Sequence, residues 1–176
     1  MKATGIVRRI DELGRIVIPK EIRRVLRIRE GDPIEIYTDT DGVVLKKYAR
    51  IREIGDYAET YCQALCGALG FSAAVTDAET VLFAAGPMKK KLIGLPLSAA
   101  YTDRMLKKQV LTETEGYTLS DGAEPISKLC AVPILSMGDL IGSVLIATDE
   151  ARLEIRDSEI QIVKTAALYL GKQLDI

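Results

Sequence analysis

Apolar positions near the start of the chain fall in short β-branched runs separated by turn-forming residues. Residues 5–10 and 15–18 are such runs, and Asp11-Glu12-Leu13-Gly14 between them has turn chemistry, with Gly14 free to adopt a positive φ. Pro19 suits the first turn of a helix, which we expect to extend to about Arg27 or Ile28. The pattern therefore predicts two short strands followed by a helix.

The predicted helix is amphipathic, and its polar face is unusual. At about 100° per residue, Ile22, Val25 and Leu26 form one apolar stripe. The opposite side is basic and contains no acid: Lys20, Arg23, Arg24 and Arg27. Because like charges one helical turn apart repel, we expect a partner of opposite charge to relieve this repulsion.

Two further strands are predicted at residues 34–38 and 43–48, around an Asp41-Gly42 pair that favours a hairpin. The earlier run Ile16-Val17-Ile18 is continuously apolar, as in a strand that is buried on both faces. A module of about fifty residues without metal or disulfide buries too little surface to be stable alone. We therefore expect two chains to interleave and share one core, which would pair their arginines about a two-fold axis.

The rest of the chain alternates helical and extended patterns, which predicts an α+β domain around an antiparallel sheet. The expected helices cover residues 54–69, 98–109 and 157–174, and the expected strands 72–75, 81–85, 129–135 and 140–147. Gly70 would end the first helix, and Ser158 with Gln161 has the spacing of a capping box at the last. We interpret Met88-Lys89-Lys90-Lys91 as a solvated loop, with contact to an anionic ligand as the alternative.

The balance of basic and acidic residues changes between the first fifty residues and the predicted α+β domain. Residues 1–52 hold 13 Lys and Arg against 8 Asp and Glu, whereas residues 53–176 hold 11 against 17. We therefore expect a basic domain at 1–52 and an acidic one at 53–176. A basic surface held apart from an acidic remainder is typical of proteins that bind a polyanion such as DNA. The first aromatic residue is Tyr37, so stacking on single strands is disfavoured and duplex DNA is favoured.

The amino-acid composition excludes several classes of catalytic and metal site. The sequence has no histidine, which removes Ser-His and Cys-His catalysis and His-ligated zinc. Cys62, Cys66 and Cys130 are an odd number of thiols, which fits a reducing cytoplasm, and we expect them to be small buried residues. No run of 18 apolar residues and no secretory signal is present, so we expect a cytoplasmic protein without a membrane partner. We expect neither enzyme activity nor a bound cofactor or metal.

The run from Met1 to Pro19, followed by Glu21-Ile22-Arg23-Arg24 and Ile34-Glu35-Ile36-Tyr37, closely resembles the AbrB family of bacterial transition-state regulators. The resemblance implies a swapped-hairpin β-barrel, in which two chains interlace their strands into one dimer. It also implies DNA contacts by the residues that match the family's arginines, namely Arg8, Arg15, Arg23 and Arg24. Arg9 and Lys20 are additional expected phosphate contacts.

The segments Cys130 to Ile134, Gly138-Asp139 and Ile141 to Ile146 are similar to the late hairpin of GAF domains, sensory modules that often hold a small ligand. An AbrB-like head followed by a GAF-like tail resembles bacterial sporulation regulators. This implies a sequence-preferring, DNA-binding regulator of sporulation (forespore) genes. Its tail would sense an unknown small molecule or associate dimers into homotetramers through the helices at 54–69 and 158–174. Two alternatives stay open, an antitoxin of the MazE type and a GAF-type methionine-sulfoxide reductase fused to a DNA-binding head.

Overall fold

The computed structural model describes residues 5–26, 28–48 and 50–175, and the chain forms two compact units. The first unit ends at Tyr48, and the second comprises the rest of the chain. The short 3-10 helix η1, Arg50–Ile54, packs with the second unit through Ile51 and Ile54, both of which are buried there. The boundary of independently folding domains at residues 52 and 53 stays a prediction.

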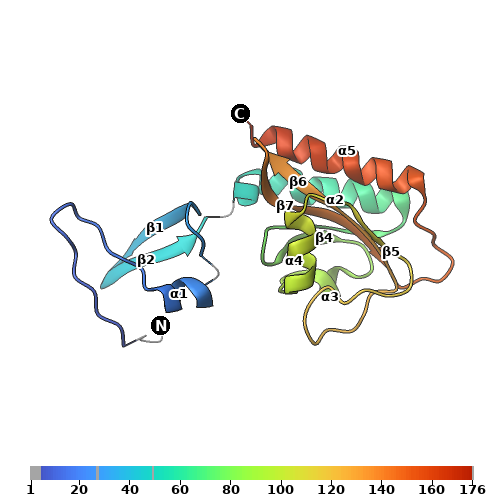
Figure 1. Ribbon diagram of the computed structural model, residues 1–176. Coiled ribbons are helices and arrows are strands. Elements are labelled where there is room, and N and C mark those ends of the chain that lie inside the picture. Colours follow the sequence, from blue (N-terminus) through green and yellow to red (C-terminus); the bar gives the residue numbers. More distant parts are fainter. Residues whose placement is uncertain (1–4, 27, 49, 176) are drawn as a thin grey trace. The chain divides into compact units, whose positions relative to one another are not determined.

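The first unit contains one short helix and one hairpin (Figure 1). Helix α1 is Lys20–Val25, and strands β1, Ile34–Asp39, and β2, Gly42–Lys47, pair antiparallel across the predicted turn. The hairpin is therefore confirmed. Helix α1 ends earlier than expected, with Leu26 as its C-cap, and the expected end at Arg27 lies outside the described residues.

The predicted strands at 5–10 and 15–18 are wrong for the single chain. The turn between them forms, with the amide of Gly14 donating to the carbonyl of Asp11 at 3.0 Å and Gly14 at φ +74°. The two flanking segments, however, are extended without a strand ladder. A ladder needs a neighbouring strand to accept and donate its hydrogen bonds, and the chain offers these segments none in the described residues.

Apolar side chains of the first unit remain uncovered. Apart from Pro19, no apolar side chain is buried among the described residues 5–48. Val7 is 84% exposed and Val25 is 80% exposed, and the predicted stripe of α1 has only Ile22 half-buried. So many exposed apolar side chains on so short a unit indicate an interaction site.

The second unit is a five-stranded antiparallel sheet with helices on both faces (Figure 1). The strand order is β4-β3-β7-β6-β5. The strands are β3, Ser72–Thr76; β4, Val81–Ala85; β5, Leu111–Glu113; β6, Lys128–Ser136; and β7, Asp139–Thr148. The helices are α2, Gly55–Leu69; α3, Lys89–Leu92; α4, Ala99–Leu106; and α5, Asp157–Gln173.

Two separate apolar cores hold this sheet. One lies beneath α2 and α5 and includes Ala58, Leu65, Val163 and Leu170. The other lies beneath α4 and includes Tyr101, Met105 and Leu145. Within the second core, the Tyr101 hydroxyl lies 2.6 Å from Ser143 Oγ, which lies 2.7 Å from Thr76 Oγ1. The second unit is thus an α+β domain around an antiparallel sheet, as the sequence predicts, and the structure adds that helices cover both faces of the sheet.

Several local expectations for this unit need correction. The run at 88–91 is not a solvated loop, because α3 forms there with Met88 and Leu92 buried. The capping box of Ser158 and Gln161 is wrong, since the backbone amide of Arg156 donates to Glu159 Oε2 at 2.9 Å instead. Helix α4 ends before the expected residue 109. By contrast, Gly70 ends α2 with φ +73°, as predicted.

Candidate nucleic-acid interface

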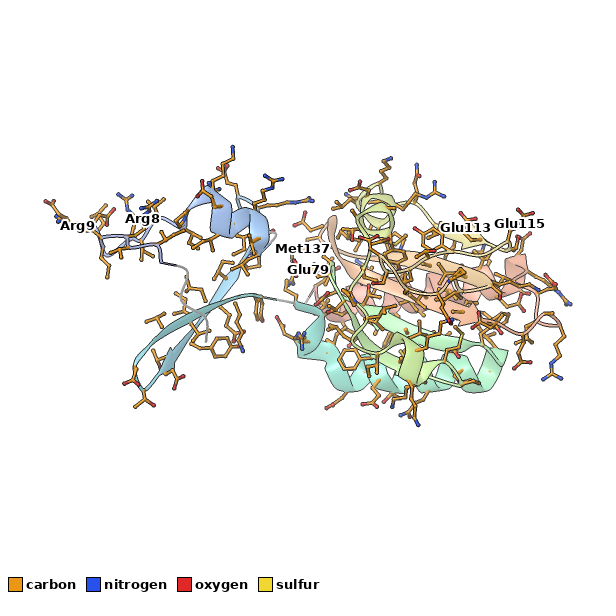
Figure 2. All side chains as sticks on the ribbon, turned by 90° about the horizontal axis from the view of Figure 1, so that it is seen from below. Arg8, Arg9, Glu79, Glu113, Glu115 and Met137 are labelled. Carbon is orange, nitrogen blue, oxygen red and sulfur yellow. The ribbon has the colours of Figure 1, made fainter. Side chains whose placement is uncertain are left out.

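The six basic residues predicted to contact DNA all lie in one stretch of the first unit, residues 8–24, which we call the basic stretch. Arg8 and Arg9 lie on the extended segment before the turn (Figure 2), Arg15 follows the turn, and the others are on α1: Lys20, Arg23 and Arg24. Five are exposed and Arg23 is half-buried. Their charges are therefore available to an external anion rather than consumed in a core.

Arg15 is tied to the turn that precedes it. Its Nε donates to Asp11 Oδ2 at 2.8 Å, and its backbone amide donates to Asp11 Oδ1 at 2.8 Å. The backbone amide of Leu13 donates to the same Oδ1 at 3.0 Å. These hydrogen bonds, first that of the Arg15 amide and then that of its guanidinium, hold the pKa of Asp11 below its ordinary value.

Helix α1 places its basic side chains one turn apart, because Arg23 and Arg24 follow Lys20 at three and four residues. The Nε of Arg23 is buried and has no hydrogen-bond partner within the described part of the chain. A buried donor left without an acceptor costs roughly 1–3 kcal/mol. An acceptor oxygen that packs against this buried nitrogen would remove that cost.

Asp11 is the residue of this region that the sequence reasoning missed. A signal for it was present: an aspartate at the start of a turn favours hydrogen bonds to backbone amides two residues on. Its spacing of four from Arg15 also brings the two side chains within reach once the turn closes. From the sequence, Asp11 was placed in the turn but was not paired with Arg15.

The second unit offers little reactive chemistry. No group of three or more potential metal ligands occurs in the described ranges. Cys62 and Cys130 are buried as expected, and Cys66 is half-buried. Burial raises the pKa of the Cys62 thiol to about 12, so at neutral pH the sulfur is protonated and a poor nucleophile.

A cavity of about 200 Å³ opens beside α3 in the second unit. Its walls are mainly apolar, with one lysine and one glutamate: Lys91, Leu95, Leu119, Ala123, Glu124 and Ile126. Lys91 is partly engaged elsewhere, since its Nζ lies 3.1 Å from Asp149 Oδ2.

None of the described helices is both long and apolar enough to span a membrane.

Comparisons with known protein families match both parts of the chain. Residues 53–175 match the family described as "Stage V sporulation protein T C-terminal, transcription factor". Residues 7–53 match the family described as "Antidote-toxin recognition MazE, bacterial antitoxin". The MazE match ends at residue 53, before helix α2, and so leaves out the sheet of the second unit.

Two curated relatives from Bacillus subtilis (strain 168) are similar to this chain. Stage V sporulation protein T is 43% identical over 180 residues, covering 99% of each chain. Transition state regulatory protein AbrB is 62% identical over 48 residues, covering 27% of this chain and 50% of the relative. The second match confirms the AbrB resemblance.

Solved structures resemble the second unit at low sequence identity. A GAF domain from a phosphoenolpyruvate-protein phosphotransferase of Coxiella burnetii has a TM-score of 0.54 at 16% identity, covering 71% of this chain and 90% of that one. A type II free methionine-R-sulfoxide reductase from Thermoplasma acidophilum has a TM-score of 0.56 at 14% identity, covering 71% and 94%. These likenesses confirm a GAF-like fold for the second unit.

Proposed function

The chain belongs to the family of Stage V sporulation protein T, and from that membership we propose that it is a sequence-preferring DNA-binding regulator of sporulation (forespore) genes. The observation that carries the proposal is the basic stretch, in which five of six basic side chains are exposed. Folding does not require this excess of basic residues, since Lys20, Arg23 and Arg24 lie one helical turn apart and repel one another. A duplex of DNA supplies the opposite charge.

Binding would use the six residues in two ways. Phosphate contacts by Arg8, Arg15, Arg23 and Arg24, helped by Arg9 and Lys20, would supply most of the affinity. A minority of base-edge contacts and the shape of the DNA would supply selectivity, because a guanidinium can donate two parallel hydrogen bonds to guanine.

The binding form would be a homodimer through residues 1–52. The uncovered apolar side chains of the first unit support this, since they would be buried if two chains interlaced their extended segments. Each segment at 5–10 and 15–18 would then gain the strand partner that it lacks in the single chain. The paired arginines would match a two-fold symmetric DNA site.

Residues 53–176 would form a separate domain that associates dimers into a homotetramer. Helices α2 and α5 pack on the same sheet face, and Tyr61 stacks on Tyr169 with ring centroids 5.1 Å apart. Their outer surfaces still expose Tyr57 and Leu168, which are 54% and 65% exposed. Apolar helix faces of this kind support helix–helix contact between chains.

A small-molecule ligand is a second candidate role for this domain, and the cavity beside α3 favours it. An apolar cavity of about 150 Å³ is enough to hold a benzene-sized molecule. A ligand of the 200 Å³ cavity would therefore be small and mainly apolar. The protein would act in the cytoplasm, where its DNA and a reducing environment for its three thiols are found.

The alternative functions have less support. A reductase of the GAF type would need a reactive thiolate, whereas the high pKa of Cys62 keeps that sulfur protonated. We propose that the protein is not an enzyme, because the family that matches residues 53–175 is described as a transcription factor. An antitoxin would use a disordered acidic tail to wrap its toxin, whereas residues 50–175 are folded around two cores.

Binding of a duplex operator by arginine variants tests the proposal. Arg15→Ala and Arg23→Ala should each lower affinity for duplex DNA at least 10-fold at 100 mM salt, because each removes a phosphate contact from both chains of a dimer. Arg152→Ala is the matched control, since Arg152 is 82% exposed but lies in the second unit. Fluorescence anisotropy measures the affinity and sedimentation measures the oligomeric state.

The proposal fails if both variants bind like the Arg152→Ala control while their sedimentation is unchanged. Loss of the oligomer in either variant would instead assign that arginine to folding. Comparison of the two readouts keeps these cases apart.

A further inference from the structure

Asp11 carries a negative charge in the middle of the basic stretch, and the geometry assigns it a role. We propose that Asp11 is a positioning residue that holds the Arg15 guanidinium in its DNA-binding orientation. The proposal rests on the proposed function, since it takes Arg15 to be a DNA contact. It goes further by giving an acid a positive contribution to the binding of a polyanion.

The carboxylate of Asp11 is used twice. Oδ1 accepts the backbone amides of Leu13 and Arg15, at 3.0 and 2.8 Å, and thereby closes the turn. Oδ2 accepts Arg15 Nε at 2.8 Å and thereby fixes the side chain to the turn. One oxygen thus organises the backbone, and the other organises the guanidinium.

The fixed guanidinium remains available to a ligand. Nε is one of five N–H donors of an arginine, and the Arg15 side chain is still 70% exposed. Its outer edge, with the Nη donors, can therefore meet a phosphate or a guanine. A flexible arginine would have to be ordered on binding, whereas this one is ordered beforehand.

Simple electrostatics and positioning predict opposite signs. If only charge mattered, Asp11 would repel phosphates, and neutralising it would strengthen DNA binding. If Asp11 positions Arg15, neutralising it weakens binding although the protein becomes more positive. The sign of the effect therefore distinguishes the two explanations.

Asp11→Asn separates the two uses of the carboxylate. The amide oxygen of an asparagine can still accept the backbone amides of Leu13 and Arg15, so the turn is kept. Its amide nitrogen is a donor and cannot accept Arg15 Nε. Glu12→Gln is the matched control, because it makes the same charge change at the neighbouring exposed residue.

The test measures duplex binding by wild type, Asp11→Asn, Glu12→Gln, Arg15→Ala and the Asp11→Asn/Arg15→Ala double variant in the full-length protein. We expect Asp11→Asn to weaken binding about 3–10-fold, Glu12→Gln to leave it unchanged or strengthen it, and Asp11→Asn to have no weakening effect once Arg15 is absent. Stronger binding by Asp11→Asn, equal to that of Glu12→Gln, would overturn the positioning role. Normal binding by Arg15→Ala would show that Arg15 is not a DNA contact and would also overturn the positioning role, whereas the proposed function fails only if Arg23→Ala binds normally as well.

A measurement on the unaltered protein covers the case in which Asp11→Asn does not fold. In the absence of DNA, the Arg15 Nε–H group should give a distinct nuclear magnetic resonance signal with restricted motion and slow exchange with water. The exposed Arg24 provides the internal comparison. Equal mobility of the two Nε–H groups would contradict the proposal.

Discussion

The three cysteine side chains differ in burial, and this difference predicts their reactivity. Cys62 and Cys130 are buried and Cys66 is half-buried. Burial raises the pKa of Cys62 to about 12 and also raises that of Cys130. At pH 8 we therefore expect iodoacetamide to modify Cys66 first, and the other two only when the protein unfolds. Peptide mass spectrometry checks this, and rapid modification of Cys62 in the folded protein would restore the case for thiol chemistry.

At the scale of single residues, some features of the site could be predicted from the sequence and others could not. The exposed charges of the basic stretch were predictable, because arginine and lysine side chains rarely lose water without a partner. The link between Asp11 and Arg15 depends on the closed turn, whose hydrogen bonds are made by backbone amides that a charge count does not consider. The protonated state of Cys62 depends on the core that surrounds it, which no single residue type reveals.

At the scale of elements, the contact between α5 and β6 is a close approach of two backbones. A Cβ added at Gly171 would lie 2.2 Å from the carbonyl oxygen of Leu135. We therefore expect Gly171→Ala to force α5 away from the sheet and lower the free energy of unfolding by about 1–3 kcal/mol. Gly67→Ala in α2 is the control, because a Cβ there meets nothing within 4 Å. It should stabilise the protein by roughly 0.5–1 kcal/mol. Denaturant unfolding measures both, and equal effects would contradict this packing.

Asp175, which follows α5, accepts hydrogen bonds from the tip of the β6–β7 hairpin. Asp175 Oδ1 accepts Ser136 Oγ at 2.8 Å and the Met137 amide at 3.1 Å. The hydrogen bond from Ser136, followed by that from Lys172, lowers the pKa of Asp175 below its ordinary 3.8. A lowered pKa means that the ionised form stabilises the fold at neutral pH, and that this contribution is lost as the pH falls through the lowered value.

Asp175→Ala should therefore speed hydrogen exchange at the Met137 amide at pH 7. The difference from wild type should persist at pH 3.8 and shrink only as the pH falls through the lowered pKa of Asp175, because the wild-type carboxylate becomes protonated only there. Asp121→Ala is the control, since Asp121 lies in an exposed loop. An exchange difference that stays unchanged when the pH is taken from 7 to well below the lowered pKa would show that the charge of Asp175 does not hold the hairpin.

Elements of the second unit followed the sequence more closely than those of the first. Strand β4 has the predicted bounds, because its apolar run is flanked by turn residues and pairs within the same chain. The segments at 5–10 and 15–18 have strand composition but form no strand in the described part of the chain, so local pattern and single-chain structure disagree. Helix α3 was not predicted, because three consecutive lysines indicate a solvated segment. Met88 before them and Leu92 after them are nevertheless buried.

For the whole molecule, the account depends on two chains presenting their basic stretches together to one duplex. The uncovered apolar side chains of the first unit are the structural reason to expect the pair, and the full-length match to a sporulation regulator gives its biological setting. The opposite net charges of the two parts could be predicted from the sequence, because they follow from residue counts alone. The dimer could only be predicted, because the structure of a single chain does not include the second chain.

The salt dependence of duplex binding by the full-length protein tests this claim most directly. Four arginines from each of two chains, mostly on phosphates, predict that affinity falls roughly 10³-fold or more between 50 and 200 mM salt. The logarithm of the affinity should fall linearly with the logarithm of the salt concentration. An affinity that changes less than about threefold over that range would contradict a cationic surface formed by paired basic stretches.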